Sequence, residues 1–187
     1  MKKINLKNIL VLSVFLLMIP FSCSKDPIIN ESELITTVYY SMHSTTSNDS
    51  VVLSFRDLDG DGGQAPTIIG GKLKSNASYN CTLLLLNESV NPIDSITLEI
   101  LQEANDHQFF LTPSNSLNVT AMYNDTDTNG FPIGQKSILQ TGEASQGSLT
   151  ITLRHLPNKN AVGVKDGKIE NAGGETDIEL QFDLIIE

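Results

Sequence analysis

The chain has 187 residues, of which 22 are acidic and 12 are basic, and its formal charge is −10 at pH 7. This length fits one domain or two small ones. A hydrophobic content of 40% is enough for a packed core, and 18% charged residues are too few for an acidic disordered chain. The excess of acid argues against nucleic-acid binding, which needs a basic surface. Two cysteines exclude a disulfide-rich scaffold and a four-thiolate zinc site.

The N-terminus has the features of a secretory signal peptide. Met1–Lys7 carries three lysines and no acid, and the mostly apolar run 8–20 follows it. That run is shorter than the roughly 20 apolar residues of a typical membrane-spanning helix. Ser22 and Cys23 come directly afterwards, and a small residue before a cysteine at this point resembles a bacterial lipobox. We therefore expect a lipoprotein signal peptide at 1–22 and lipidation of Cys23.

Lipidation would place the mature protein on a membrane. Acyl chains gain about 0.8 kcal/mol per buried methylene, so two or three of them, palmitate included, hold a soluble domain stably. We expect the bacterial outer membrane, on its periplasmic or cell-surface side, with residues 23–33 as a lipidated tether. The alternatives are an ordinary signal peptide cut after Ser22 and an uncleaved N-terminal anchor.

Residues 34–187 are predicted to form one mostly β domain. Segments rich in β-branched residues, many of them alternating, are separated by Gly, Pro, Asn and Asp turns. In the last segment Ile178, Leu180, Phe182 and Leu184 share one face. The expected strands are 34–42, 51–56, 78–86, 107–112, 117–123, 137–141, 147–155 and 176–186. About eight such strands indicate an antiparallel, immunoglobulin-like β-sandwich.

One segment, 94–104, breaks the strand pattern and predicts a short helix. Pro92 precedes it, and Asp94 is a candidate N-cap. Leu98 and Leu101, with Ile100 as a further candidate, have near-helical spacing.

Two inter-strand loops carry oxygen ligands at alternate positions followed by glycine, as at the opening of a calcium loop. The first holds Asp57, Asp59 and Asp61, and the second holds Asp125, Asp127 and Asn129. Ile68 and Lys136 stand where an EF-hand has its closing Glu, so Ca²⁺ would need ligands from elsewhere. The alternative is an acidic turn closed by Asx-type hydrogen bonds.

His107 and His155 each lie at the end of an expected strand. Together with a carboxylate they could hold zinc, copper or iron if the fold brings them together. The alternative is a pair of hydrogen-bonded strand-end imidazoles. Cys81 lies in a strand and is expected to be a small core residue, and Gly173–Gly174 predicts a tight turn before the last strand.

No catalytic motif is present in the sequence. It lacks a Gly-x-Ser-x-Gly elbow, a His-Glu-x-x-His pair and the Gly-Lys-Ser/Thr of a phosphate loop. We therefore expect a protein that is not an enzyme. An enzyme such as a glycan hydrolase would need two convergent carboxylates in a cleft, and no spacing here predicts one.

Several segments together resemble a family of small flavobacterial (Bacteroidetes) outer-membrane lipoproteins. They are ELITTV (33–38), LSFRDLDGDGG (53–63), LLNES (85–89), HQFF (107–110), LRHLPNK (153–159) and NAGGETDIE (171–179). Members often carry the label of a type 1 periplasmic-binding-fold protein, which names a doubly wound α/β fold that this strand-rich chain does not predict. Some are encoded beside TonB-dependent receptors, which implies an accessory role in nutrient or metal capture.

The expected function is therefore that of a non-enzymatic, membrane-anchored lipoprotein. It would bind a ligand or a metal as an accessory to an outer-membrane uptake receptor. The alternative is a structural or adhesion module of the cell surface whose Asp loops hold calcium for rigidity.

Overall fold

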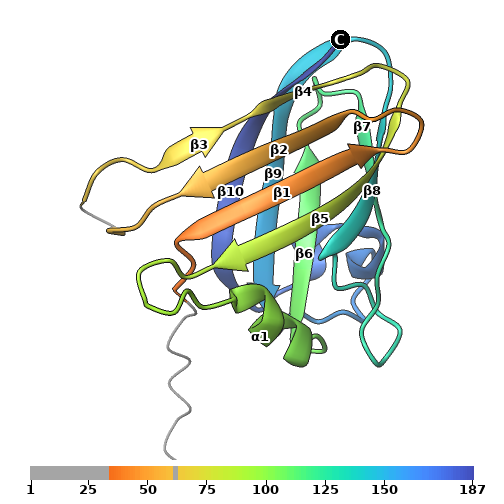
Figure 1. The fold of residues 1–187 in the computed structure, drawn as a ribbon. Coiled ribbons are helices and arrows are strands. Elements are labelled where there is room, and N and C mark those ends of the chain that lie inside the picture. The colour runs from red at the N-terminus through yellow and green to blue at the C-terminus, as the bar shows by residue number, and fades with distance from the viewer. Residues whose placement is uncertain (1–33, 61–62) are drawn as a thin grey trace, which may run out of the picture. The chain divides into compact units, whose positions relative to one another are not determined.

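The computed structural model describes residues 34–60 and 63–187, which form ten strands and one α-helix (Figure 1). The elements are β1 (Thr37–Ser44), β2 (Ser50–Arg56), β3 (Thr67–Ile69), β4 (Gly71–Leu73), β5 (Ser78–Leu86), α1 (Ile96–Gln102), β6 (His107–Pro113), β7 (Val119–Tyr123), β8 (Lys136–Thr141), β9 (Ser145–His155), the 3₁₀ turns η1 (Val164–Asp166) and η2 (Ile169–Asn171), and β10 (Glu175–Ile186). The predicted signal peptide, Cys23, the tether and Asp61 lie outside the described residues. Within these ranges no helix is long and apolar enough to cross a membrane.

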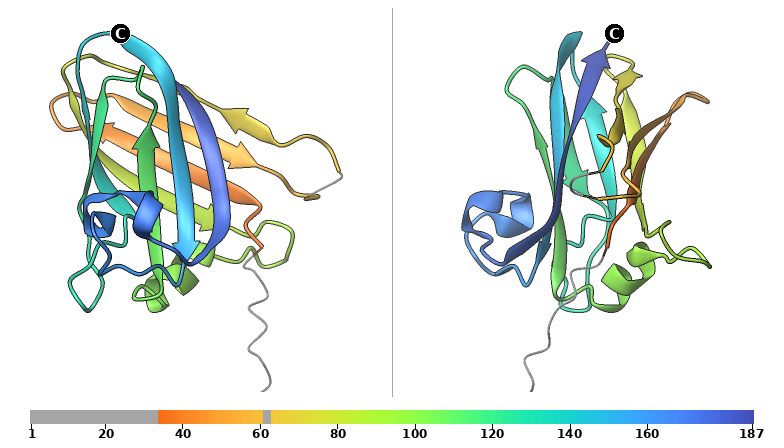
Figure 2. Two further views of the ribbon diagram at one scale, coloured as in Figure 1. Left: turned by 180° about the vertical axis from the view of Figure 1, so that it is seen from behind. Right: turned by 90° about the vertical axis from the view of Figure 1, so that its left-hand side faces the viewer.

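The strands form two sheets that pack face to face, as the edge-on view in Figure 2 shows. One sheet has the order β3-β2-β1-β5-β8-β7 and the other β4-β10-β9-β6. The expected mostly β sandwich is confirmed, and each of the eight expected strands is present with its ends shifted by a few residues at most. β3 and β4 were not expected, and β4 pairs with β10 in parallel, so the sandwich is not purely antiparallel.

The core lies between the two sheets. The alternation predicted for the last strand is confirmed, because Leu180, Phe182 and Leu184 of β10 are buried and the residues between them are exposed. Cys81 is 2% exposed, as expected for a core residue. Burial raises the pKa of its thiol, which is the opposite of what an activated nucleophile needs.

The chain passes from one sheet to the other at Gly70 and Gly71, between β3 and β4. A Cβ on Gly70 would collide with the backbone carbonyl of Asp183, and one on Gly71 would lie 2.7 Å from a methyl of Val51. The missing side chains therefore let this crossing pack against both β2 and β10.

The helix is shorter than predicted and is not capped by Asp94. α1 begins at Ile96 with Ser95 as N-cap, and no side chain bonds the first turn. The backbone of Asp94 instead exchanges two hydrogen bonds with that of Asn87, at 3.0 and 3.1 Å, which holds it in an extended bridge.

The buried face of α1 is not the predicted one. Ile96, Thr97 and Ile100 face the core, and Leu98 and Leu101 are 59% and 40% exposed. The Thr97 hydroxyl accepts a hydrogen bond of 2.7 Å from the amide of Leu85 at the end of β5. This polar contact fixes the rotation of the helix and turns both leucines outward.

Candidate functional site

His107 and His155 lie side by side at one end of the four-stranded sheet. They are direct partners on β6 and β9, and their rings stack with centroids 4.8 Å apart and planes 8° from parallel. The His107 Nε2 lies 3.8 Å from the Oδ2 of Asp177, which is the bulged residue in the pairing of β10 with β9. Bulges redirect side chains. This bulge lies at Asp177, the third residue of the cluster.

The stacked geometry does not suit a metal ion. A metal bound by an imidazole lies in the plane of the ring, along the nitrogen lone pair. The two rings are stacked and nearly parallel. An ion that lies in the plane of one ring, along its nitrogen lone pair, is therefore outside the plane of the other ring. Across residues 34–60 and 63–187, no three His, Cys, Asp or Glu side chains could hold a metal ion together. The structure thus brings the two histidines together in a stacked arrangement that does not favour a transition metal, and such a site stays a prediction.

The His107 ring and the Asp177 carboxyl face each other with acceptor atoms. The Nδ1 of His107 lies 3.1 Å from the carbonyl oxygen of Glu103, so this nitrogen donates. In a neutral ring Nε2 is then an acceptor, and it faces the carboxylate of Asp177. Two acceptors repel unless one of them carries a proton.

The electrostatics of Asp177 agree with this conclusion. Its Oδ2 is buried and has no hydrogen-bond partner among the residues described. Burial raises the pKa of this carboxyl, the charges of His107 and His155 oppose that rise, and Glu175 adds to it. The raised pKa means that Asp177 takes up a proton more readily than an exposed aspartate does.

The predicted turn at Gly173–Gly174 holds this end of the sheet together. Both residues have positive φ, +59° and +70°. A Cβ on Gly174 would collide with the carbonyl oxygen of His155 and lie 2.9 Å from the carbonyl carbon of Leu156. Glycine therefore lets the start of β10 close onto the end of β9, beside the histidine pair.

The first Asp loop is closed by its own backbone. Asp57 accepts a hydrogen bond of 2.9 Å from the amide of Gly60, and Asp59 accepts one of 2.9 Å from the amide of Gln64. These are the Asx-type bonds of an acidic turn. With Asp61 outside the described residues, calcium at this loop stays a prediction.

The second Asp loop is held by hydrogen bonds to both of its aspartates, and calcium at this loop stays a prediction. Both oxygens of Asp125 accept backbone amides, those of Gly134 and Lys136, at 2.7 Å. The Oδ1 of Asp127 accepts the amides of Asn129 and Phe131, each at 2.9 Å. Its Oδ2 pairs with an ammonium, so every carboxylate oxygen of the two aspartates already accepts at least one hydrogen bond.

That ammonium belongs to Lys159, whose side chain is almost fully buried. Its Nζ donates to Asp127 Oδ2 at 2.8 Å and to the carbonyls of Ala104 and Pro132 at 2.7 and 3.1 Å. Burial raises the pKa of Asp127, but the bonds from Lys159 and from the backbone outweigh it and leave the pKa below its ordinary value. Lys159 therefore ties the β9–β10 loop to two others. The sequence offers no sign of this partner, which is 32 residues from Asp127.

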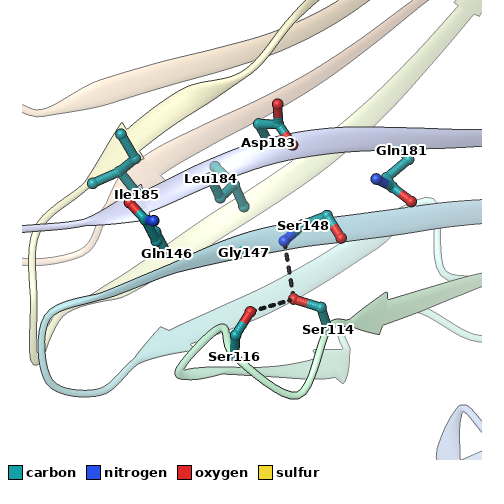
Figure 3. A pocket seen from close by; sticks show the side chains of 9 residues that line it. All are labelled: Ser114, Ser116, Gln146, Gly147, Ser148, Gln181, Asp183, Leu184 and Ile185. Carbon is teal, nitrogen blue, oxygen red and sulfur yellow. Dashed lines mark hydrogen bonds between the residues drawn. The ribbon is translucent and has the colours of Figure 1, made fainter.

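A shallow groove, lined by both polar and apolar surface, crosses the outer face of the other end of this sheet (Figure 3). It has a volume of about 600 Å³. Asp183 pairs with Ser148, and Ile185 pairs with Gln146, across β10 and β9, and these side chains point away from the core. The groove is lined by Ser114, Ser116, Gln146, Gly147, Ser148, Gln181, Asp183, Leu184 and Ile185.

Gly147 brings the serine turn after β6 into the groove. A Cβ at this position would collide with the hydroxyl of Ser114 and lie 2.7 Å from that of Ser116. The Ser114 hydroxyl also accepts the amide of Ser148 at 3.0 Å. The groove thus combines hydroxyl, carboxamide and carboxylate groups on three segments held close together. Sequence reasoning missed it because only the strand register places these residues side by side.

Compared with protein-family models, with curated proteins and with solved structures, the chain has no match.

Proposed function

We propose that the protein is a non-enzymatic binding lipoprotein, anchored through Cys23 to the bacterial outer membrane. The anchoring is supported by the basic, apolar and Ser-Cys segments of the N-terminus. The strand-rich domain then presents its binding surfaces from a rigid scaffold. By analogy with the family that the sequence resembles, the bound molecule would be passed to a TonB-dependent receptor.

The observation that carries the binding role is the lining of the groove. Gln146 and Gln181 offer both donors and acceptors, the serines offer either, and Asp183 is an acceptor. A ligand bearing many hydroxyls needs both kinds of partner at close spacing. Neighbouring strands lie about 4.8 Å apart, and same-face residues along a strand about 6.8 Å apart, so the groups form a grid. A small saccharide, which has both hydroxyls and apolar C–H groups, fits this mixed lining better than a metal does.

The test of the binding role uses the ¹⁵N-labelled soluble chain titrated with neutral mono- and disaccharides by NMR. We expect chemical-shift changes at residues 146–148 and 181–185. Asp183→Ala and Gln146→Ala should each weaken binding on the order of tenfold, since each removes hydrogen bonds to the ligand. The matched control is Gln140→Ala, which removes an exposed glutamine from the other sheet. Shifts outside the groove, or equal effects of both glutamine variants, would contradict the assignment.

The test of the anchor is the mass of the N-terminal peptide from the protein made in a lipoprotein-processing bacterium. We expect a peptide that begins at Cys23 and carries acyl chains, and membrane association that Cys23→Ala abolishes. An unmodified Cys23 would refute the anchoring and leave the groove assignment to its own test.

A further inference from the structure

Exposed aliphatic side chains gather at one end of the domain. This apolar rim consists of Leu34 (54% exposed), Val90 (45%), Ile93 (58%), Leu98 (59%), Leu101 (40%) and Leu156 (62%). Its members come from the segment before β1, the β5–α1 loop, α1 and the end of β9, all at the lower end of Figure 1. The pairing of Thr37 with Leu86 and the 2.6 Å hydrogen bond from Leu156 to Asp106 confirm that these segments are neighbours.

The opposite end of the domain is polar. It is made of the turns 45–49, 74–77, 114–116 and 142–144, which contain Ser, Thr, Asn, Asp, Lys, Glu, Gly and Ala. Hydrogen bonds from Thr45 to Ser78 and from Asn76 to Gly142 hold three of these turns together. Among the described residues, none of the exposed large hydrophobic side chains belongs to these turns. Eight other exposed large hydrophobic side chains lie elsewhere on the domain, but the six of the rim come from adjoining segments at one end, and such a group indicates an interaction surface.

The helix shows that this exposure is built into the fold. Leu98 and Leu101 are three residues apart and so lie on one face of α1, the face turned to solvent. A rotation of the helix would bury them, but the bond from Leu85 to the Thr97 hydroxyl prevents it. The domain therefore keeps two exposed leucines where a simple amphipathic helix would have polar residues.

We propose that the apolar rim rests on the surface of the lipid bilayer that holds Cys23. This inference relies on the proposed anchoring. Cys23 is eleven residues from Leu34, and a chain of that length spans at most about 40 Å whatever its conformation. Because the rim begins at Leu34 itself, the anchor keeps the rim within that distance of the membrane. Confinement at this range gives even a weak surface contact a high occupancy.

The charges beside the rim define which lipid surface it fits. Asp94, Glu99, Glu103 and Asp106 belong to the same end of the domain. Burial raises the pKa of Glu99, and the neighbouring carboxylates of Asp94 and Glu103 raise it further. These acids would be repelled by anionic headgroups, so the rim suits a zwitterionic surface.

The experiment uses the acylated full chain in phosphatidylcholine vesicles, with an environment-sensitive fluorophore on a single introduced cysteine. Leu98→Cys places the label on the rim, and Ser47→Cys places it on the polar end as the matched control. Cys81 is buried and so does not take the label. We expect the emission of the label at 98, and not at 47, to shift to the blue and to be quenched by spin-labelled lipid. Replacement of part of the phosphatidylcholine by anionic phosphatidylglycerol should weaken the blue shift and the quenching at position 98. Added salt should restore both, because it screens the repulsion.

The outcomes separate this inference from the anchoring itself. Equal emission from both labels would overturn the inference, and so would a label at 98 that is shielded from water but not quenched by lipid, because a protein would then cover the rim. If Cys23 carries no acyl chain, the anchoring fails, and vesicles are titrated into the two labelled proteins with Cys23 replaced by Ala, so that the introduced cysteine remains the one that takes the label. A response confined to position 98, weakened on the order of tenfold by Leu101→Ser and unchanged by Val52→Ser, would still support the rim. No response at any lipid concentration would overturn it.

Discussion

Replacement of Lys159 by methionine is expected to destabilise the domain severely. The lysine and Asp127 side chains are 4% and 0% exposed, and the ammonium has three hydrogen-bond acceptors. Methionine fills a similar volume but leaves a buried carboxylate oxygen and two carbonyls without this donor. Removal of one partner of a buried ion pair costs about 3–5 kcal/mol. Since domains are typically stable by about 5–15 kcal/mol, the loss is a large share of the total. For a domain of this size we expect Tm to fall by roughly 6–20 °C.

The assay is urea denaturation of wild type and Lys159→Met at several pH values, with Lys165→Met, an exposed lysine of the same loop, as control. The folded pKa of Asp127 is lowered in the wild type, so its contribution is present above the ordinary value of 3.8 and is lost as pH falls below it. In the variant the uncompensated carboxylate has a pKa raised by burial and gains a proton on mild acidification. The difference in free energy of unfolding between wild type and Lys159→Met should therefore be largest at neutral pH and should become smaller toward pH 4. A gap below about 1 kcal/mol at neutral pH, or one that does not change with pH, would refute this reasoning.

Two further predictions concern the end of the sheet that holds the histidine pair. Gly174→Ala should cost more than Gly173→Ala in thermal denaturation: both add about 1–2 kcal/mol of left-handed strain, but only the first places a Cβ against the backbone of His155 and Leu156. Equal losses would contradict the close approach. Asp177→Asn should raise the neutral-pH Tm by a few degrees, on the order of 1 kcal/mol, because the amide can donate to Nε2 of His107. Because the folded pKa of Asp177 is raised, the wild-type free energy of unfolding falls as pH rises from 3.8 through that folded pKa. Asn does not titrate, so calorimetry at several pH values should find a smaller dependence of stability on pH in the variant. A lower Tm or an unchanged slope would show that the carboxylate is well paired.

The long strands could be read from the sequence because each of them alternates over many residues. β10 and β9 are predicted almost to the residue, since alternate burial on a sandwich forces one apolar face. β3 and β4 were missed because each is three residues long, too short for a period, and all three residues of β3 are exposed. The face of α1 was wrong for another reason: a hydroxyl contact with β5 overrides the leucine spacing.

The sites were harder to predict because they depend on pairing between distant segments. The sequence named His107 and His155 but not their register on β6 and β9, which determines that the rings stack and do not converge on a metal. Asp127 looks like a calcium ligand until Lys159 is placed beside it. The groove has no motif at all, because hydroxyl and amide side chains on the outer face of a strand resemble any solvated surface.

The parallel pairing of β10 with β4 affects how the domain acquires its structure. Leu184 meets Gly71 and Ile186 meets Leu73, so segments from opposite halves of the chain must come together to complete this edge of the sheet. Chains dominated by such distant pairings fold over milliseconds to seconds. A partly made chain lacks β10 and cannot complete this edge, so if the protein is exported as proposed, the finished domain forms only after the last strand has been made.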